Sequence, residues 1–385
     1  MAEEAVRLVI GGGGTGGHTQ PGVAVLRALC RRVPVEALWI GSHAGLERQV
    51  ASGAGIPFIA VSTGKLRRYL SAHTLADAIR VPLGIIQAYR HIRAFRPHVV
   101  FGTGGFVSVP AVIGGFAAGY PVLIHEQTAT AGLATRINAR FADVIALSYV
   151  TSERALRTRR GKVVVTGNPV RPELLDGHAA KVYQEFGLAP DLPIVYITGG
   201  ALGAHAINLV VERALPRLLE RTQVIHQCGP ASMNGDYPRL LDRRSSLPAE
   251  LAARYVVREF LGEELADVYA AAWLVVGRAG AGTIAELAAL GKPSVLIPLP
   301  GASGDEQTLN ARILSKAGAA VLLPQRELSE ARLLDVIGQI LDDESQRLRM
   351  AAAARQQARL DAADRLADLI LELARRPVSE RTLAR

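Results

Sequence analysis

The glycine-rich segment Gly11–His18, with the sequence GGGGTGGH, constrains the fold of this chain more than any other feature. It follows the apolar run Val6–Ile10 and precedes a helix-like segment, Val23–Cys30. Glycines adopt positive φ and let the backbone approach an anion, and a helix N-terminus offers free N–H groups and a partial positive charge. The strand, the turn and the helix start therefore predict a phosphate-binding edge of an α/β domain.

The same strand–glycine–helix pattern occurs a second time at Ile194–Leu209, with the sequence IVYITGGALGAHAINL. The matching positions of the two segments are Gly12 and Gly199, Gly13 and Gly200, Gly16 and Gly203, and His18 and His205. A chain of 385 residues is also too long for one ordinary core. We therefore expect two similar α/β domains whose glycine turns face one cleft.

The charge balance indicates an anionic partner. The chain has 44 basic and 35 acidic residues, a formal net charge of +9, which favours phosphates, nucleic acid or an acidic membrane surface. The sequence lacks RNP-type aromatic motifs and zinc-finger spacings, so no nucleic acid is expected. Cys30 and Cys228 lie in separate halves and outside any CxxC motif, which is typical of a reduced, cytoplasmic protein.

One segment is apolar enough to need a membrane test. Val99–Ile124 carries no charged residue over 26 positions, a length that can span a bilayer. Six glycines together with Pro110 and Pro121 interrupt it, so we expect a buried strand–loop–helix–strand unit instead. The charged start of the chain argues against an N-terminal signal peptide.

Strand-like and helix-like segments alternate along both halves, which predicts an α/β protein with two parallel sheets covered on both faces. The expected strands are Val6–Ile10, Ala37–Ile40, Phe58–Val61, Val99–Phe101, Val122–His125, Val144–Leu147, Val163–Thr166, Ile194–Thr198, Gln223–Gln227, Tyr255–Glu259, Leu274–Val276, Ser294–Ile297 and Ala320–Leu323. The Pro-containing segment Gly167–Pro172 is the expected linker. We expect domains at residues 1–167 and 168–355, with a terminal helix within 356–385 that packs back on the first domain.

Two common kinds of chemistry are not predicted. Gly12, Gly14 and Gly17 match the dinucleotide fingerprint, but the second strand ends in Trp39–Ser42 without the carboxylate that would hold a ribose of NAD. The sequence contains no Asp-x-Asp pair and no HExxH motif. We therefore expect no metal and no cofactor, and glycine amides, helix ends and arginines would have to neutralise a diphosphate.

Several polar residues follow predicted strands, where open α/β sheets bind their ligands. His18 is placed to accept a proton from an attacking hydroxyl, and we favour this over a histidine that only bonds a loop. For His125–Gln127, ligand binding and a strand end satisfied by loop amides both stay open. Arg171 and the turn Arg278–Thr283 are candidates for phosphate binding. Glu286 is either a ribose ligand or a surface carboxylate.

The combination of motifs resembles one family. The motifs are GGTGGH at Gly13–His18, FGTGGFVS at Phe101–Ser108, HEQ at His125–Gln127, GNPVR at Gly167–Arg171, RAGAGTIAE at Arg278–Glu286 and QxxNA at Gln307–Ala311. Together they resemble the MurG family of bacterial cell-wall glycosyltransferases. The resemblance implies a GT-B fold of two Rossmann-like domains. It also implies transfer of N-acetylglucosamine from UDP-GlcNAc to lipid I, the undecaprenyl-diphosphate-linked muramoyl pentapeptide, which gives lipid II.

The resemblance also implies roles for residues at matching positions. His18 becomes the general-base candidate, with Glu126 as second candidate. The residues implied to contact UDP-GlcNAc are Thr15, Gly16, Gly17, Thr128, Arg171, Ala201, Leu261, Arg278, Thr283, Glu286, Gln307 and Asn310. Thr128, Ala201 and Ala279 depart from the family pattern, where Asn, Ser and Ser are common, and each change removes the family's own donor group, an amide or a serine hydroxyl, at that position.

A lipid-linked acceptor and the basic charge together favour an interfacial surface. The segment Thr74–Phe95 repeats apolar residues at helical spacing, which by periodicity alone is more typical of core packing. The expected acceptor and membrane residues are Lys65, Arg67, Arg68, Ile79, Leu83 and Ile86. The expected location is the cytoplasmic face of the bacterial membrane, with cell-wall or division proteins as further partners. Two rival functions stay open: a UDP-GlcNAc 2-epimerase-like enzyme and a non-catalytic UDP-sugar-binding protein.

Overall fold

The computed structural model describes residues 5–64, 72–156 and 161–375. The chain forms two compact units. The first unit runs up to Val170 and takes in the C-terminal part from Arg359, whereas the second spans Arg171–Ala358. The backbone thus passes between the units twice.

The described part of the first unit contains a seven-stranded parallel sheet with the order β3-β2-β1-β4-β5-β6-β7. Its strands are β1 (Val6–Gly12), β2 (Val35–Gly41), β3 (Phe58–Ala60), β4 (Val99–Gly104), β5 (Val122–Glu126), β6 (Val144–Leu147) and β7 (Lys162–Val165). The strand order reverses between β1 and β4, and this switch point is where doubly wound sheets bind ligands. The first glycine turn follows β1 directly.

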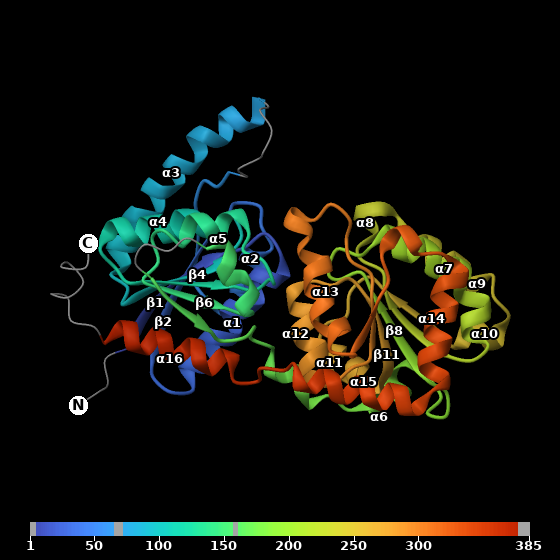
Figure 1. The fold of residues 1–385 in the computed structure, drawn as a ribbon. Helices are drawn as coiled ribbons and strands as arrows, with labels where there is room; N and C mark the ends of the chain where they lie inside the picture. Colours follow the sequence, from blue (N-terminus) through green and yellow to red (C-terminus); the bar gives the residue numbers. More distant parts are fainter. Residues whose placement is uncertain (1–4, 65–71, 157–160, 376–385) are drawn as a thin grey trace. The chain divides into compact units, whose positions relative to one another are not determined.

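Helices cover both faces of this sheet (Figure 1). The described helices of the unit are α1 (Gly16–Cys30), α2 (Glu47–Gly53), α3 (Ala72–Phe95), α4 (Ser108–Ala118), α5 (Leu133–Asn138) and α16 (Ala362–Ala374). One face packs on α3, α4 and α5, with Ala88, Ile92 and Val112 in its core, and the other packs on α1 and α16. The predicted unit Val99–Ile124 is confirmed as β4, α4 and the start of β5.

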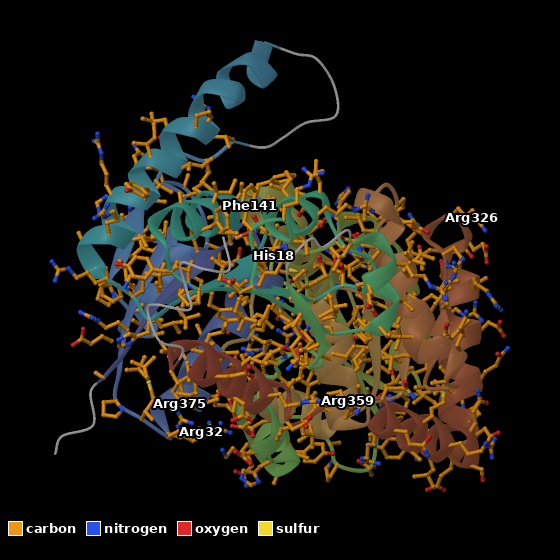
Figure 2. All side chains as sticks on the ribbon, turned by 60° about the vertical axis from the view of Figure 1, so that its left-hand side comes forward. His18, Arg32, Phe141, Arg326, Arg359 and Arg375 are labelled. Carbon is orange, nitrogen blue, oxygen red and sulfur yellow. The ribbon has the colours of Figure 1, made fainter. Side chains whose placement is uncertain are left out.

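Helix α16 belongs to this unit although it lies at the far end of the chain. Its residues Leu366, Ile370 and Leu373 are fully buried in the same core as β1. Arg32, labelled in Figure 2, pairs with Asp364 at 3.2 Å and Asp368 at 2.5 Å on α16. The helix that precedes α16 in the chain ends at Gln356, so the two are separate helices.

The described part of the second unit contains a six-stranded parallel sheet with the order β10-β9-β8-β11-β12-β13. Its strands are β8 (Ile194–Thr198), β9 (Gln223–Gln227), β10 (Tyr255–Arg258), β11 (Ala272–Gly277), β12 (Ser294–Leu296) and β13 (Ala320–Leu322). Its order is the same as that of the first six strands of the other unit, so the sequence repeat is also a structural repeat. Together with the first sheet this confirms the predicted α/β fold and every predicted strand.

The helices of the second unit again form two layers (Figure 1). They are α6 (Ala179–Phe186), α7 (His205–Leu219), α8 (Ala231–Asn234), α9 (Asp236–Ser245), α10 (Ala249–Ala253), α11 (Leu265–Ala271), α12 (Ala281–Leu290), α13 (Glu306–Lys316), α14 (Glu330–Asp342) and α15 (Glu344–Gln356). Val211, Leu215 and Ile337 pack α7 and α14 on one face of the sheet. Helices α11 and α12 lie on the other face.

Candidate active site

The first glycine turn connects β1 to α1 and carries His18. Thr15 is extended, with φ of −143° and ψ of 160°, so the helix begins at Gly16 rather than at Val23 as expected. His18 therefore lies in the first helical turn, beside the switch point of the sheet (Figure 2). Thr15, Gly16 and Gly17 form the helix start, where backbone N–H groups have no partner within the helix.

The first turn does not present all of its amides to a ligand. The N–H of Gly14 donates to Oε2 of Glu47 at 3.1 Å, and the N–H of Ser42 donates to Oε1 at 2.8 Å. Glu47 is fully buried. Burial acts to raise its pKa, but the hydrogen bonds from Ser42 and Gly14 hold it below the ordinary value. The prediction that this turn binds phosphate through its amides is therefore wrong for Gly14, because the N–H of Gly14 already donates to a carboxylate of this chain.

The imidazole of His18 contacts Gln127, the residue after β5, and lies next to Gly104 at the end of β4. Its Nδ1 lies 3.1 Å from Oε1 of Gln127. Gly104 makes room for this contact, since a Cβ there would lie 2.7 Å from His18 Nδ1 and 3.0 Å from Gln127 Oε1. Gly104 also has a φ of +102°, which side chains rarely adopt. The two glycine-rich motifs of the first unit therefore meet at His18.

Gln127 is itself held by two further groups. Its Nε2 donates to the carbonyl oxygen of Thr103 at 2.6 Å and lies 3.2 Å from His125 Nδ1. His125 is buried, and its Nε2 lies 3.0 Å from the carbonyl oxygen of Gly167. Burial lowers the pKa of His125 to about 4, so this ring is neutral at physiological pH. From the sequence, ligand binding and a structural strand end both stay open for His125–Gln127, and the structure connects His125 to His18 through Gln127.

Glu126, the second candidate base, organises its own loop. Its Oε1 accepts from the N–H of Thr128 at 3.0 Å and from the Thr128 hydroxyl at 2.7 Å. Its Oε2 accepts from the N–H of Gly132 at 3.2 Å. Glu126 and Thr128 are both buried. These contacts give both residues a structural role in the loop after β5.

The second glycine turn connects β8 to α7 in the other unit. Gln227, at the end of β9, donates from Nε2 to the carbonyl oxygen of Gly200 at 3.0 Å. Its Oε1 accepts from the N–H of Leu261 at 3.2 Å. Ala201 is exposed at the tip of the turn. The backbone of Leu261, one of the residues implied to contact UDP-GlcNAc, is thus linked to the second glycine turn through the buried amide of Gln227.

Glu286 is a partly buried carboxylate with two side-chain partners rather than a surface carboxylate. Its Oε1 lies 3.4 Å from Nη2 of Arg171, and its Oε2 accepts from the hydroxyl of Tyr269 at 3.1 Å. Burial raises the pKa of Glu286, and Arg171 and Tyr269 oppose that shift. The structure places Arg171 on this carboxylate. Tyr269, on α11, was missed from the sequence because an aromatic residue in an apolar helix reads as core.

The remaining residues that were predicted to contact UDP-GlcNAc lie near the ends of β11 and β12. The Arg278 guanidinium donates to the carbonyl oxygens of Ile297 at 3.0 Å and Pro298 at 3.1 Å, and to Gln325 at 2.7 Å. Gln307 Oε1 accepts from the N–H of Leu299 at 2.9 Å. The other two predicted residues are Thr283, in the first turn of α12, and Asn310, whose Nδ2 donates to the backbone carbonyl oxygen of Ala279 at 3.2 Å.

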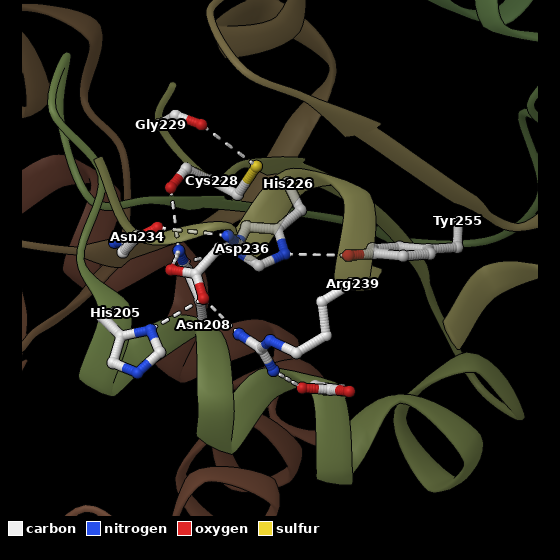
Figure 3. A network of polar contacts seen from close by, with 10 residues as sticks. His205, Asn208, His226, Cys228, Gly229, Asn234, Asp236, Arg239 and Tyr255 are labelled. Atoms are coloured by element: carbon white, nitrogen blue, oxygen red, sulfur yellow. Dashed lines mark hydrogen bonds and ion pairs between the residues drawn. The ribbon is translucent and has the colours of Figure 1, made fainter. Parts of the chain in front are cut away.

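A buried polar network fixes the start of α7 (Figure 3). His205 Nδ1 lies 2.7 Å from Oδ1 of Asp236, a fully buried carboxylate that also accepts from Asn208 at 2.7 Å. Arg239 pairs with Asp236 and with Glu212. Asn208 Oδ1 lies 3.0 Å from Nε2 of buried His226. His205, which matches His18 in the sequence repeat, is therefore backed by a charged cluster.

The predicted membrane surface is described only in part. Lys65, Arg67, Arg68 and the side chain of Ile79 lie outside the described residues. Leu83 and Ile86 on α3 are about half exposed, at 46% and 51%. Over the residues that the structure covers, no helix has the length and apolar character to cross a bilayer. The same residues contain no cluster of three His, Cys, Asp or Glu that would hold a metal.

Two family models match this chain. The glycosyltransferase family 28 N-terminal domain matches residues 8–147, and the C-terminal domain of that family matches residues 194–366. A curated protein of Treponema pallidum (strain Nichols) is 38% identical over 349 residues, 90% of each chain. It is named UDP-N-acetylglucosamine–N-acetylmuramyl-(pentapeptide) pyrophosphoryl-undecaprenol N-acetylglucosamine transferase. The chain belongs to the MurG family.

Further comparisons agree on this family. A protein of the same name from Lachnospira eligens is 37% identical and covers 94% of this chain and 98% of its own length. The crystal structure of Acinetobacter baumannii MurG matches with a TM-score of 0.72 at 28% identity, over 96% of this chain and 100% of that one. A Neisseria meningitidis UDP-GlcNAc 2-epimerase matches at 14% identity with a TM-score of 0.66, which shows the shared fold alone. The GT-B expectation is thus confirmed by MurG.

Proposed function

We propose that this protein transfers N-acetylglucosamine from UDP-GlcNAc to the C4 hydroxyl of lipid I, which forms lipid II for peptidoglycan. Family membership over most of the chain supports this function. The observation that carries the chemistry is the His18 imidazole, which is held by Gln127 at the switch point of the first sheet. The acceptor is activated on the first unit, and the donor is bound on the second.

The proposed reaction is an inverting displacement. His18 takes the proton of the muramoyl C4 hydroxyl as the oxygen attacks the anomeric carbon, and the bond from that carbon to the diphosphate oxygen breaks. UDP leaves with the bonding electron pair, and the attack from the opposite face inverts the configuration. A positioned general base of this kind contributes about 10²–10⁴ in rate.

Glu286 is the proposed ribose ligand in the second unit. Each of its oxygens takes one contact, from Arg171 or from Tyr269, and a carboxylate oxygen has two lone pairs. One acceptor position per oxygen therefore remains for the two adjacent hydroxyls of a ribose. The N-termini of α7 and α12, each preceded by a glycine turn, are proposed to bind the diphosphate through backbone amides. Gln307 and Asn310 are proposed to contact the sugar.

The protein is proposed to work at the cytoplasmic surface of the cell membrane. Leu83 and Ile86 are exposed on α3, and Arg80, Arg90 and Arg93 on the same helix are exposed as well. An apolar surface with basic neighbours fits the headgroup region of anionic lipids. Cell-wall and division proteins are further proposed partners.

The deciding experiment is transfer of radiolabelled sugar from UDP-GlcNAc to a lipid I analogue. We expect a lipid-linked disaccharide product and UDP release that depends on the lipid. UDP release at the same rate without lipid I would contradict the proposal and favour the epimerase alternative. Donor binding without turnover in the presence of authentic acceptor would favour a binding protein.

A further inference from the structure

A continuous chain of hydrogen bonds ends at the His18 ring, and all of its members belong to the first unit. The chain starts at the backbone carbonyl of Gly167 and runs through His125 and Gln127 to His18. A second carbonyl, that of Thr103, joins it at Gln127. Each of these contacts is between 2.6 and 3.2 Å. Such a chain restricts where each proton can lie.

The two carbonyl groups set the direction of every bond. A carbonyl oxygen only accepts, so Nε2 of His125, which faces the Gly167 carbonyl at 3.0 Å, must carry a proton. The Ser148 hydroxyl lies 3.2 Å from the same Nε2 and then acts as a second acceptor, since a hydroxyl can donate or accept. A neutral imidazole carries one proton, which leaves His125 Nδ1 as an acceptor. Burial, which lowers the pKa of His125 to about 4, keeps this ring neutral. His125 Nδ1 therefore accepts from Gln127.

The Gln127 amide has the same constraint at both of its contacts. Thr103 O accepts at 2.6 Å and His125 Nδ1 accepts at 3.2 Å, so the Gln127 atom facing them must be the NH₂ group with its two protons. The amide oxygen then faces His18 Nδ1 at 3.1 Å. An amide oxygen only accepts, so His18 Nδ1 must be the donor.

We propose that Gln127 is a positioning residue that fixes the neutral His18 ring in the tautomer with the proton on Nδ1 and the lone pair on Nε2. This inference rests on the proposed function, because it names the nitrogen that accepts the proton of the acceptor hydroxyl. His125 and the carbonyl groups of Thr103 and Gly167 act through Gln127. The wrong tautomer would present an N–H to the hydroxyl and accept no proton.

The arrangement also explains two features of the sequence. The third residue of the HEQ motif is an amide, and only an amide offers a double donor on one side and an acceptor on the other. A glutamate would set an oxygen against two acceptors. Gly104 is required because a Cβ would fall within 3.0 Å of both atoms of the His18–Gln127 contact.

The test is a long-range ¹H–¹⁵N correlation spectrum of the ¹⁵N-labelled full chain at about pH 8, above the ordinary imidazole pKa. A His18→Asn variant assigns the His18 signals among the nine histidines. We expect a protonated Nδ1 and an unprotonated Nε2 in the unmodified protein. A protonated Nε2 would overturn the proposal. The spectrum needs no substrate, so its outcome is independent of whether the proposed transfer activity is found.

A Gln127→Leu variant tests the causal step. We expect the His18 ring to populate both tautomers, and kcat for transfer to fall at least about 10-fold while KM for UDP-GlcNAc stays within about 2-fold. The matched control is Asn138→Leu, which removes another buried amide of this unit that bonds Ser108. Its His18 spectrum should be unchanged. An unchanged His18 tautomer in folded Gln127→Leu, or the same spectral change in the control, would refute the role of Gln127.

Discussion

The two glycine turns have matching sequences, but the histidines that follow them contact different groups. His18 and His205 occupy matching places in the first turn of α1 and α7. The Nδ1 of His18 faces the neutral amide of Gln127, whereas the Nδ1 of His205 faces the carboxylate of Asp236. That carboxylate is fully buried and is shared with Asn208 and Arg239. One histidine thus contacts a neutral amide, and the other contacts a charged cluster.

The motif thus determines where each histidine lies in the fold. The side chain that each histidine contacts determines its electrostatic surroundings. Both partners come from a separate segment, 109 residues away for Gln127 and 31 residues away for Asp236. Gln127 is an uncharged amide and forms no ion pair with His18. Asp236 ties His205 into an ion cluster that joins α7 to α9 (Figure 3).

The largest expected effect separates the two histidines by catalysis. His18→Ala should lower kcat for transfer by about 10²–10⁴ with little change in KM for UDP-GlcNAc, because it removes the proposed base. His205→Ala should leave kcat within about 10-fold. Steady-state kinetics with a lipid I analogue measures both. Equal losses of kcat in the two variants would break the comparison.

The next effect separates them by stability. Asp236→Ala removes the fully buried carboxylate that His205, Asn208 and Arg239 share, and Arg239 keeps its pair with Glu212. Loss of one member of a fully buried ion pair costs about 3–5 kcal/mol, so we expect a loss below that range. Urea unfolding followed by circular dichroism should show an early transition of the second unit. Gln127→Leu, which breaks no ion pair, should destabilise the protein less. The reverse order of the two stabilities would contradict the assignment of a structural cluster.

A pH effect should appear in both units through their buried histidines. Burial lowers the pKa of His125 to about 4 and that of His226 to about 3, from an ordinary value of 6.5. Between pH 6.5 and these lowered pKa values, the unfolded chain binds more protons than the folded one. The free energy of unfolding therefore has its full value above pH 6.5 and decreases as the pH falls toward 3–4. At pH 5 each buried ring should lower the free energy of unfolding by about 2 kcal/mol relative to neutral pH.

Urea unfolding at several pH values measures this dependence. His226→Phe should reduce the loss of unfolding free energy at acid pH in the second unit and leave that loss unchanged in the first unit. The same reduction in both units, or in neither, would show that other groups carry the pH dependence.

The smallest expected effect concerns the proposed binding of UDP-GlcNAc by the second unit. Tyr269→Phe removes the hydroxyl that donates to Glu286 at 3.1 Å. A hydrogen bond to a charged group contributes about 1.5 kcal/mol or more, so KM for UDP-GlcNAc should rise about 10-fold while kcat changes little. The rise should be smaller with a 2′-deoxyribose donor. Tyr255→Phe, whose hydroxyl bonds His226, is the matched control.

The amino-acid sequence by itself determined the repeated elements of this protein. Alternating apolar runs such as Val144–Leu147, Ile194–Thr198 and Gln223–Gln227 matched their strands to the residue, because buried parallel strands are short, apolar and flanked by turn residues. The glycine turns followed from local backbone geometry. The family could be recognised because its motifs are short and contiguous.

Only the tertiary structure decided which side chains meet. Glu47 occupies the amide of Gly14, Gln127 faces His18, and Tyr269 supports Glu286, although no local pattern pairs these residues. The terminal stretch also splits between the units at residues 357–361, because α16 buries its apolar face on α1. Periodicity describes one element at a time, whereas hydrogen bonds between distant segments depend on how the sheet brings those elements together.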